Sequence, residues 1–212
     1  MEQENKNGSY YANTREEMLD FIPVECRHIL EVGCGEGKFG LLLKSRNEAE
    51  VWGAELMEEP AKTAKKNLDK VLVGDFEEQI KNLPKKYFDC IVFNDALEHL
   101  KDHYNVLREL RKCLIDGGTI ACSIPNVRYY KVLIEILFKK EFHYVHAGVL
   151  DYTHYRFFTK KSIVRTFEDC GYEIVKIRGL RGVKKWPLIK KVLFFFLGDK
   201  KFVQYGVTAR AV

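Results

Sequence analysis

The stretch that decides the fold is Ile29-Leu-Glu-Val-Gly-Cys-Gly-Glu-Gly-Lys-Phe-Gly40. It begins as an apolar run of strand type, continues as a loop with glycine at every second position, and ends where helical periodicity starts. Glycine lets the backbone N–H groups of such a loop approach a ligand closely at the positive end of the following helix. The stretch therefore predicts a strand, a ligand-binding turn and a helix in direct succession.

The same alternation continues along the chain. Strand-like apolar runs occupy His28–Gly33, Val51–Glu55, Lys70–Val73, Phe88–Phe93 and Thr119–Ile124. Helical periodicity separates them, over Phe39–Lys44, Glu59–Leu68 and His103–Leu114. Alternating strands and helices predict an α/β fold, a doubly wound and mostly parallel seven-stranded Rossmann-like sheet with helices on both faces.

The pattern changes after the fifth run. Residues 127–158 are rich in Tyr, Phe and His and predict a cap inserted into the fold. A helix at Lys161–Cys170 and a strand at Tyr172–Ile177 follow, and we expect Val203–Ala211 to close the sheet as an antiparallel edge strand. We interpret residues 1–212 as one domain, with residues 1–27 as an N-terminal cover segment.

Composition narrows the class of protein. The chain has 212 residues, 46% of them hydrophobic and 31% charged, which suits one globular core. The formal net charge of +5 is spread along the chain, so a nucleic-acid partner is not expected. Six cysteines without a C-x-x-C pair favour a reducing compartment, and a polar start without a long apolar stretch predicts a cytoplasmic protein without a transmembrane segment.

The glycine loop alone does not identify its ligand. Gly35-x-Gly37-x-x-Gly40 also matches the fingerprint of dinucleotide-binding proteins, with Glu55 about 20 residues further on where a ribose-binding acid belongs. An NAD-dependent oxidoreductase is therefore one interpretation, and a purely structural turn is another.

Two acidic positions favour a different cofactor. Glu31 lies within the end of the first strand, where its carboxylate suits an ammonium group and would repel a pyrophosphate. Gly74-Asp75-Phe76 follows the third strand, and a carboxylate beside an aromatic ring can accept a hydrogen bond from an adenine amino group. Together these positions favour a nucleoside cofactor that carries a cation.

These features together resemble class I S-adenosylmethionine-dependent methyltransferases over nearly the whole chain. The residues that carry the resemblance are Glu31-x-Gly33-x-Gly35-x-Gly37, Glu55, Gly74-Asp75 and Asn94-Asp-Ala-Leu-Glu-His99. Glu98-His99 is similar to the ubiquinone-biosynthesis type of O-methyltransferase, also called type 11. Ser123-Ile-Pro-Asn-Val127 and the segment Gly148–Thr159 resemble methyltransferases associated with bacterial surface-polysaccharide clusters.

The resemblance implies S-adenosylmethionine as cofactor, S-adenosylhomocysteine as product, and a set of cofactor-binding residues. These are Tyr11, Arg15, Glu31, Gly33, Cys34, Gly35, Gly37, Glu55, Leu56, Gly74, Asp75, Phe76, Asn94, Ala96 and His99. The glycines are expected to wrap the methionyl part, Glu31 to reach its ammonium, and Glu55 to hold both ribose hydroxyls.

The remaining roles implied by the family concern the base and the methyl group. Asp75 is expected to accept from the adenine amino group, with Phe76 offering its backbone N–H and its ring. Asn94 and Ala96 would close over the sulfonium. Arg15 is a candidate partner for the carboxylate of the cofactor.

The acceptor side is less clear from the sequence. We predict a small-molecule acceptor, sugar-linked on the narrower resemblance and methylated at oxygen, with His154 or else His99 as general base. A structural alternative is that Asp151 and Arg156 form a buried ion pair that anchors the cap. We predict no metal site. A cofactor-binding protein without catalytic activity is a further alternative.

One segment stays ambiguous between two interpretations. Residues 183–197 are both basic and apolar, so they can lie on a membrane surface as a peripheral contact. The same spacing of apolar residues also fits a helix packed on the sheet. The sequence makes no prediction of the oligomeric state.

Overall fold

In the computed structural model, which describes residues 15–182 and 198–212, seven strands form one sheet in the order β3-β2-β1-β4-β5-β7-β6. The strands are β1 (His28–Val32), β2 (Glu50–Glu55), β3 (Lys70–Val73), β4 (Phe88–Asn94), β5 (Leu114–Pro125), β6 (Tyr172–Leu180) and β7 (Gln204–Ala211). The pairs within β3-β2-β1-β4-β5 are parallel, whereas β7 is antiparallel to both of its neighbours.

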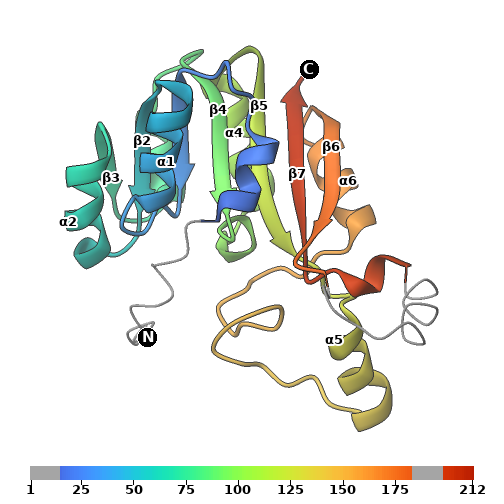
Figure 1. Cartoon of the computed structure of the whole chain (residues 1–212). Helices are drawn as coiled ribbons and strands as arrows, with labels where there is room; N and C mark the ends of the chain where they lie inside the picture. The colour runs from blue at the N-terminus through green and yellow to red at the C-terminus, as the bar shows by residue number, and fades with distance from the viewer. Residues whose placement is uncertain (1–14, 183–197) are drawn as a thin grey trace.

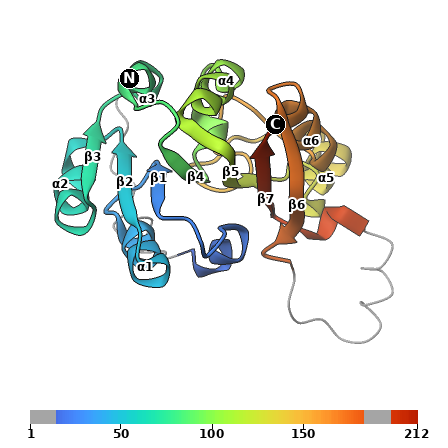
Figure 2. The same cartoon turned by 90° about the horizontal axis from the view of Figure 1, so that it is seen from above.

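Helices cover both faces of the sheet. The α-helices are α1 (Lys38–Asn47), α2 (Glu58–Asn67), α3 (Phe76–Gln79), α4 (His103–Cys113), α5 (Tyr130–Ile134) and α6 (Lys160–Glu168). Shorter helical turns are η1 (Glu16–Phe21), η2 (Ile80–Asn82), η3 (Leu97–His99), η4 (Glu135–Lys139) and η5 (Gly198–Lys201). Figure 2 shows α1 on one face of the sheet and α4 on the other.

The core consists of two hydrophobic layers separated by the sheet. Ile29 and Leu30 are neighbours on β1 and both are fully buried, but each belongs to a different layer. Consecutive strand residues point to opposite faces, so a strand buried on both sides is continuously apolar. This explains why the first strand reads as an unbroken apolar run.

Local signals set where several helices begin. The side chains of Asp75 and Asp102 accept hydrogen bonds from backbone N–H groups in the first turns of α3 and α4. Thr159 and Ser162 form a reciprocal capping box at the start of α6. Such caps satisfy N–H groups that have no partner within the helix.

The predicted fold is confirmed, with one change at the end of the sheet. The run Val203–Ala211 is antiparallel as expected, but β7 lies between β5 and β6, so the outermost strand is β6. The side chains explain the order: β7 is buried from Gln204 to Ala209, whereas β6 exposes charged residues such as Glu173. Charged side chains protect a sheet edge from pairing with other chains.

The segment predicted as a cap leaves the sheet after β5 and returns at α6. It contains α5, η4 and an extended loop, and it lies beyond the carboxyl ends of the parallel strands (Figure 1). A backbone bridge between Asn126 and Phe158 closes its base, and another joins Val145 to Asp151.

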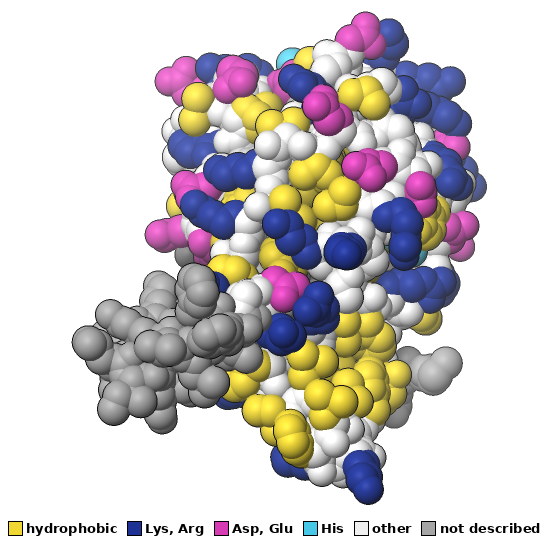
Figure 3. Space-filling view, turned by 90° about the vertical axis from the view of Figure 1, so that its right-hand side faces the viewer, with side chains coloured by type: hydrophobic (Ala, Val, Ile, Leu, Met, Phe, Trp, Pro, Cys, Tyr) yellow, Lys and Arg dark blue, Asp and Glu magenta, His cyan; other side chains and the backbone are white. Residues whose placement is uncertain are grey.

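Exposed apolar side chains gather on this cap. They are prominent in the lower part of the surface in Figure 3. Leu137 is 66% exposed and Phe138 is 79% exposed. Among residues 15–182 and 198–212, no helix has the length and apolar character that a membrane crossing requires. The ambiguous segment 183–197 lies outside the described residues.

Candidate active site

The glycine loop follows β1 and bends at three glycines. Gly33, Gly35 and Gly37 have φ values of 74°, 55° and 76°, in the left-handed region that favours glycine. Gly33 N–H donates to the carbonyl of Ala54 on β2 over 2.8 Å. Gly35 N–H donates to Glu55 Oε2, also over 2.8 Å. The loop is therefore tied to the end of β2 before any ligand binds.

Glu31 is the buried acid that the sequence predicted beside this loop. Its side chain is on β1, and the residue is only 2% exposed. Asn94 Nδ2 donates to Oε1 over 3.4 Å, while Oε2 has no hydrogen bond of normal geometry from the described residues. Burial raises the pKa of Glu31 to about 8, against the opposing effects of Asn94 and the Gly40 backbone. Burial disfavours the ionised form of Glu31, and a cationic partner would stabilise that form.

Glu55 lies at the end of β2 and faces the same loop. Its Oε2 accepts from Gly35 and its Oε1 accepts from the backbone N–H of Met57 over 2.9 Å. A carboxylate oxygen has two lone pairs, so each oxygen can accept a further hydrogen bond from a ribose hydroxyl. Leu56, the next residue, is 52% exposed.

Asp75 and Phe76 follow β3, and both were predicted to contact the adenine. Asp75 caps α3 through Oδ1, and its Oδ2 lies 3.7 Å from Lys101 Nζ. Phe76 is buried in the core and packs edge-on against Phe93. The expectation that its ring packs on adenine is therefore wrong, because the ring faces the core. Its backbone N–H remains a predicted contact. Gly74 has a φ of 117°.

Cys34 also uses its side chain in the core. Its Sγ lies 2.6 Å from the position that a Cβ on Gly53 would occupy, so the Cys34 side chain packs directly against the backbone of β2. Burial raises the pKa of the Cys34 thiol, which keeps it protonated. A cofactor contact from Cys34 would come from its backbone.

The loop after β4 closes against the glycine loop. Ala96 Cβ lies 3.0 Å from where a Cβ on Gly33 would be, so glycine is needed for this approach. Asn94 Oδ1 is buried without a hydrogen-bond partner among the described residues, close to the similarly unpartnered Oε2 of Glu31 on the neighbouring strand. Two such atoms together mark a place where a polar ligand group fits.

A polar network missed by the sequence reasoning holds this loop. Asp95 has a φ of 52°, and its Oδ1 accepts from Ser123 Oγ over 2.9 Å and from Gln204 Nε2 over 2.6 Å. Arg15 donates to Asp95 Oδ2. The participants come from distant parts of the sequence, so only the fold brings them together.

Arg15 has a structural role that the sequence did not predict. Arg15 is 7% exposed, and its guanidinium pairs with Asp95 and with Glu17. Arg15 therefore holds the loop after β4. Its contact with the carboxylate of the cofactor stays a prediction. Tyr11, predicted in the same segment, lies outside the described residues.

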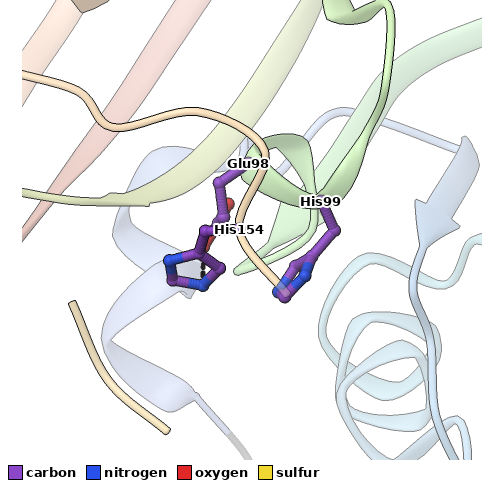
Figure 4. A group of neighbouring side chains, drawn as sticks. All are labelled: Glu98, His99 and His154. Carbon is purple, nitrogen blue, oxygen red and sulfur yellow. Dashed lines mark ion pairs between the residues drawn. The ribbon is translucent and has the colours of Figure 1, made fainter. Parts of the chain in front are cut away.

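Three side chains meet on the other side of this loop: Glu98 and His99 from η3, and His154 from the cap (Figure 4). Glu98 is fully buried, and the side chain of His154 is 5% exposed. His154 Nε2 lies 3.8 Å from Glu98 Oε1, and the two imidazole rings meet edge-on with centroids 4.7 Å apart. The structure thus brings both predicted catalytic histidines together. Glu98 was quoted in the family motif but not selected as a site residue.

The cap is fastened to this cluster by backbone contacts. Tyr155 N–H donates to the Glu98 carbonyl over 3.0 Å. Asp151 is buried and accepts from both the backbone and the hydroxyl of Thr153. Arg156 is exposed and donates to the Lys101 carbonyl. The alternative of a buried Asp151–Arg156 ion pair is therefore wrong, because one partner is at the surface.

A cavity of about 250 Å³ is lined in part by α5. Its lining is mainly apolar and includes Val132, Val145, Val149 and Leu150. The carbonyl of Val149 lies 3.2 Å from His154 Nδ1, so the cavity adjoins the histidine cluster.

The fold and the site define an α/β protein that binds a nucleoside cofactor at the carboxyl edge of its sheet. Residues 5–177 match the family model described as a methyltransferase domain, and the chain belongs to this family. It is a class I S-adenosylmethionine-dependent methyltransferase. The residues fit that cofactor, since a buried acid, an unpartnered amide oxygen and a glycine cradle meet where its methionyl part would lie.

Known relatives agree with this assignment. The chain is 27% identical over 187 residues to the ubiquinone biosynthesis O-methyltransferase of Aeromonas salmonicida, covering 85% of this chain and 75% of the relative. It is 26% identical to the enzyme of the same name from Idiomarina loihiensis, covering 73% and 65%.

Solved structures share the fold. A SAM-dependent methyltransferase from Archaeoglobus fulgidus superposes with a TM-score of 0.68 at 21% identity, covering 95% of this chain and 93% of that one. Another from Aquifex aeolicus gives a TM-score of 0.64 at 17% identity, covering 98% and 100%.

Proposed function

We propose that this protein transfers the methyl group of S-adenosylmethionine to an oxygen of a small-molecule acceptor, such as a sugar hydroxyl, bound between the loop after β4 and the cap. One observation carries the proposal. Glu98, His99 and His154 meet directly beyond Ala96, the residue that touches the glycine loop. Groups that can remove a proton thus adjoin the predicted cofactor site. The similarity to ubiquinone O-methyltransferases supports oxygen as the acceptor atom.

Residues at the ends of four strands would hold the cofactor. Glu31 and Asn94 offer their unpartnered oxygens to the ammonium of the methionyl part. Glu55 accepts from the ribose hydroxyls, and Asp75 from the adenine amino group. When bound, the cofactor supplies a methyl group activated by a sulfonium. The protein's part is to fix that methyl group in line with the acceptor oxygen, since alignment alone lowers the barrier substantially.

His154 is the residue that we assign to the acceptor proton. Its Nδ1 lies 3.2 Å from the Val149 carbonyl, so a tautomer with the proton on Nδ1 leaves Nε2 as the basic atom. As the bond between the acceptor oxygen and the methyl carbon forms and the carbon–sulfur bond breaks, the hydroxyl proton passes to Nε2. Loss of that proton keeps the product ether neutral. The remaining alternative is that alignment suffices and no base is used.

The proposal is tested by finding the acceptor. The purified protein is incubated with S-adenosylmethionine carrying a labelled methyl group and with a fractionated extract of its own host, and the labelled product is identified. We expect an O-methylated small molecule, and a nucleotide sugar or glycan would support the sugar-linked acceptor. The variant Glu55→Ala serves as the control, because labelling that depends on this site should disappear with it.

Other products would contradict the proposal. Label found on nucleic acid, on protein or on a nitrogen atom would overturn a small-molecule O-methyltransferase. Cofactor binding without any labelled product would favour the alternative of a binding protein without catalytic activity.

A further inference from the structure

We propose that Glu98, His99 and His154 form a binding site for a divalent transition-metal ion, which in turn binds the acceptor oxygen. The inference rests on the proposed function for its chemical role, although metal binding itself can be measured without an acceptor. No metal was predicted from the sequence, because His154 is 55 residues away from His99 and no ligand spacing joins them.

The geometry brings one ligand atom from each residue into a small volume. These atoms all lie within 4.8 Å of one another. Tetrahedral coordination at about 2.0–2.2 Å would place neighbouring ligand atoms about 3.4 Å apart. His154 Nε2 and Glu98 Oε1 are already 3.8 Å apart, so a contraction of a few tenths of an ångström suffices for this pair. Among the described residues, this is the group of His, Cys, Asp and Glu side chains that could hold an ion.

The hydrogen bonds around the imidazoles point to the same conclusion. His154 Nδ1 lies 3.2 Å from the Val149 carbonyl, and His99 Nδ1 lies 3.2 Å from the Thr153 carbonyl. Histidines that bind metals usually donate their other ring N–H to such an acceptor, which fixes the tautomer and turns the second nitrogen toward the ion. Both rings have such an acceptor at Nδ1, and His99 Nδ1 also lies 3.1 Å from the Thr153 hydroxyl.

The contact between His154 and Glu98 also suits an ion. A ring with its proton on Nδ1 turns the lone pair of Nε2 toward a carboxylate oxygen 3.8 Å away, too far for a normal hydrogen bond. A divalent ion would fit between these two atoms at this separation after a small contraction.

The donor set indicates which ions fit. Two imidazole nitrogens and one carboxylate suit Zn²⁺, Co²⁺ and related ions, whereas Mg²⁺ and Ca²⁺ prefer oxygen ligands throughout. Three protein ligands leave a coordination position open, as in zinc sites that act in catalysis. With the ion bound, His154 Nε2 is a metal ligand and no longer the base, so the metal takes over that part of the proposed function. An acceptor hydroxyl in the open position loses its proton to water more readily, and its oxygen then takes the methyl group as the carbon–sulfur bond breaks.

The test uses the full chain stripped of metal with a chelator and titrated with Co²⁺, whose visible absorption reports its coordination. We expect one equivalent to bind with the spectrum of a low-coordinate site, to be displaced by Zn²⁺ and to persist in excess Mg²⁺. Glu98→Gln and His99→Ala should each weaken Co²⁺ binding at least about tenfold. Glu98→Gln preserves the side-chain volume, and thermal melts of both variants establish that they fold.

His28→Ala is the matched control. His28 also lies near two carboxylates, 3.9 Å from Glu50 and 3.8 Å from Asp89, but it is 43% exposed and at the other end of β1. Its replacement should leave Co²⁺ affinity unchanged. Failure of wild-type protein to bind Co²⁺ saturably, or equal affinity in folded His99→Ala, would overturn the metal site.

A calorimetric titration of the same samples with S-adenosylhomocysteine separates the two claims. If the cofactor product binds and Co²⁺ does not, the metal site is wrong and the proposed function stands. If Co²⁺ binds and the cofactor product does not, the metal site stands and the proposed function is wrong.

Discussion

The glycine loop at residues 33–37 and the cap at residues 127–158 lie at the same edge of the sheet, yet they differ in exposure and in the contacts that hold them. The loop is bounded by Glu31 and Glu55, which are 2% and 8% exposed, and hydrogen bonds tie it to β2. The cap leaves Leu137 66% and Phe138 79% exposed. The difference teaches that the cofactor side is preorganised by local geometry, whereas the acceptor side depends on a few long-range contacts.

The largest expected effect is on the loop. Glu55→Ala removes two acceptors for ribose hydroxyls, and charge-assisted hydrogen bonds contribute about 1.5–3 kcal/mol each. We therefore expect the dissociation constant of S-adenosylhomocysteine to rise more than about 100-fold. Calorimetry measures it. The control is Glu59→Ala, whose carboxylate on α2 is 84% exposed. An unchanged constant in Glu55→Ala would mean that the ribose binds elsewhere.

The corresponding change on the cap side is His154→Ala. Proton-transfer groups contribute at least about 100-fold to turnover, so kcat with the identified acceptor should fall by this factor while cofactor affinity stays the same. The control His28→Ala should keep full turnover. A melting temperature that drops together with activity would instead indicate a structural role, and full activity would leave alignment alone or another histidine, such as His99 or His146.

A smaller effect concerns the stability of the cofactor-free protein. The folded state raises the pKa of Glu31 to about 8, so it binds a proton that the unfolded chain releases at lower pH. Stability should therefore be highest in mild acid and fall between about pH 5 and about pH 8. Thermal melts across this range measure the slope. Glu31→Gln should flatten it, and an equal slope in both proteins would show that Glu31 is already ionised.

The smallest effect is expected at the surface of the cap. Phe138→Ser should change the free energy of unfolding by less than about 0.5 kcal/mol, because this side chain is largely exposed. Phe93→Ala is the contrasting variant, since Phe93 is fully buried on β4 and its loss should cost about 3–5 kcal/mol. Chemical denaturation compares the two. A large loss in Phe138→Ser would mean that a partner surface covers the cap in solution.

The sequence was sufficient wherever the controlling interaction is local. The apolar run before Gly33 and the alternation that follows it predict the first five strands, because periodicity and turn residues act over a few positions. Glu31 and Glu55 were found for the same reason, as each lies at a strand end beside the loop. The outermost position of β6 was missed, because pairing of β7 with both β5 and β6 depends on tertiary contacts.

The rest of the site depends on residues that are far apart in the chain. Arg15 pairs with Asp95, which also binds Gln204, and no spacing rule connects these positions. Phe76 was assigned to the adenine because an aromatic ring follows Asp75, yet burial of the ring against Phe93 was the stronger effect. The meeting of Glu98 with His154 likewise requires the cap to fold back onto η3.

The most direct test of the central claim is a calorimetric titration of the cofactor-free protein with S-adenosylhomocysteine and, separately, with NAD. The buried acid beside the glycine loop should bind the cationic methionyl part and repel a pyrophosphate. We predict saturable binding of S-adenosylhomocysteine that Glu55→Ala weakens and Glu59→Ala does not, with no comparable binding of NAD. Tighter binding of NAD than of S-adenosylhomocysteine would contradict the account.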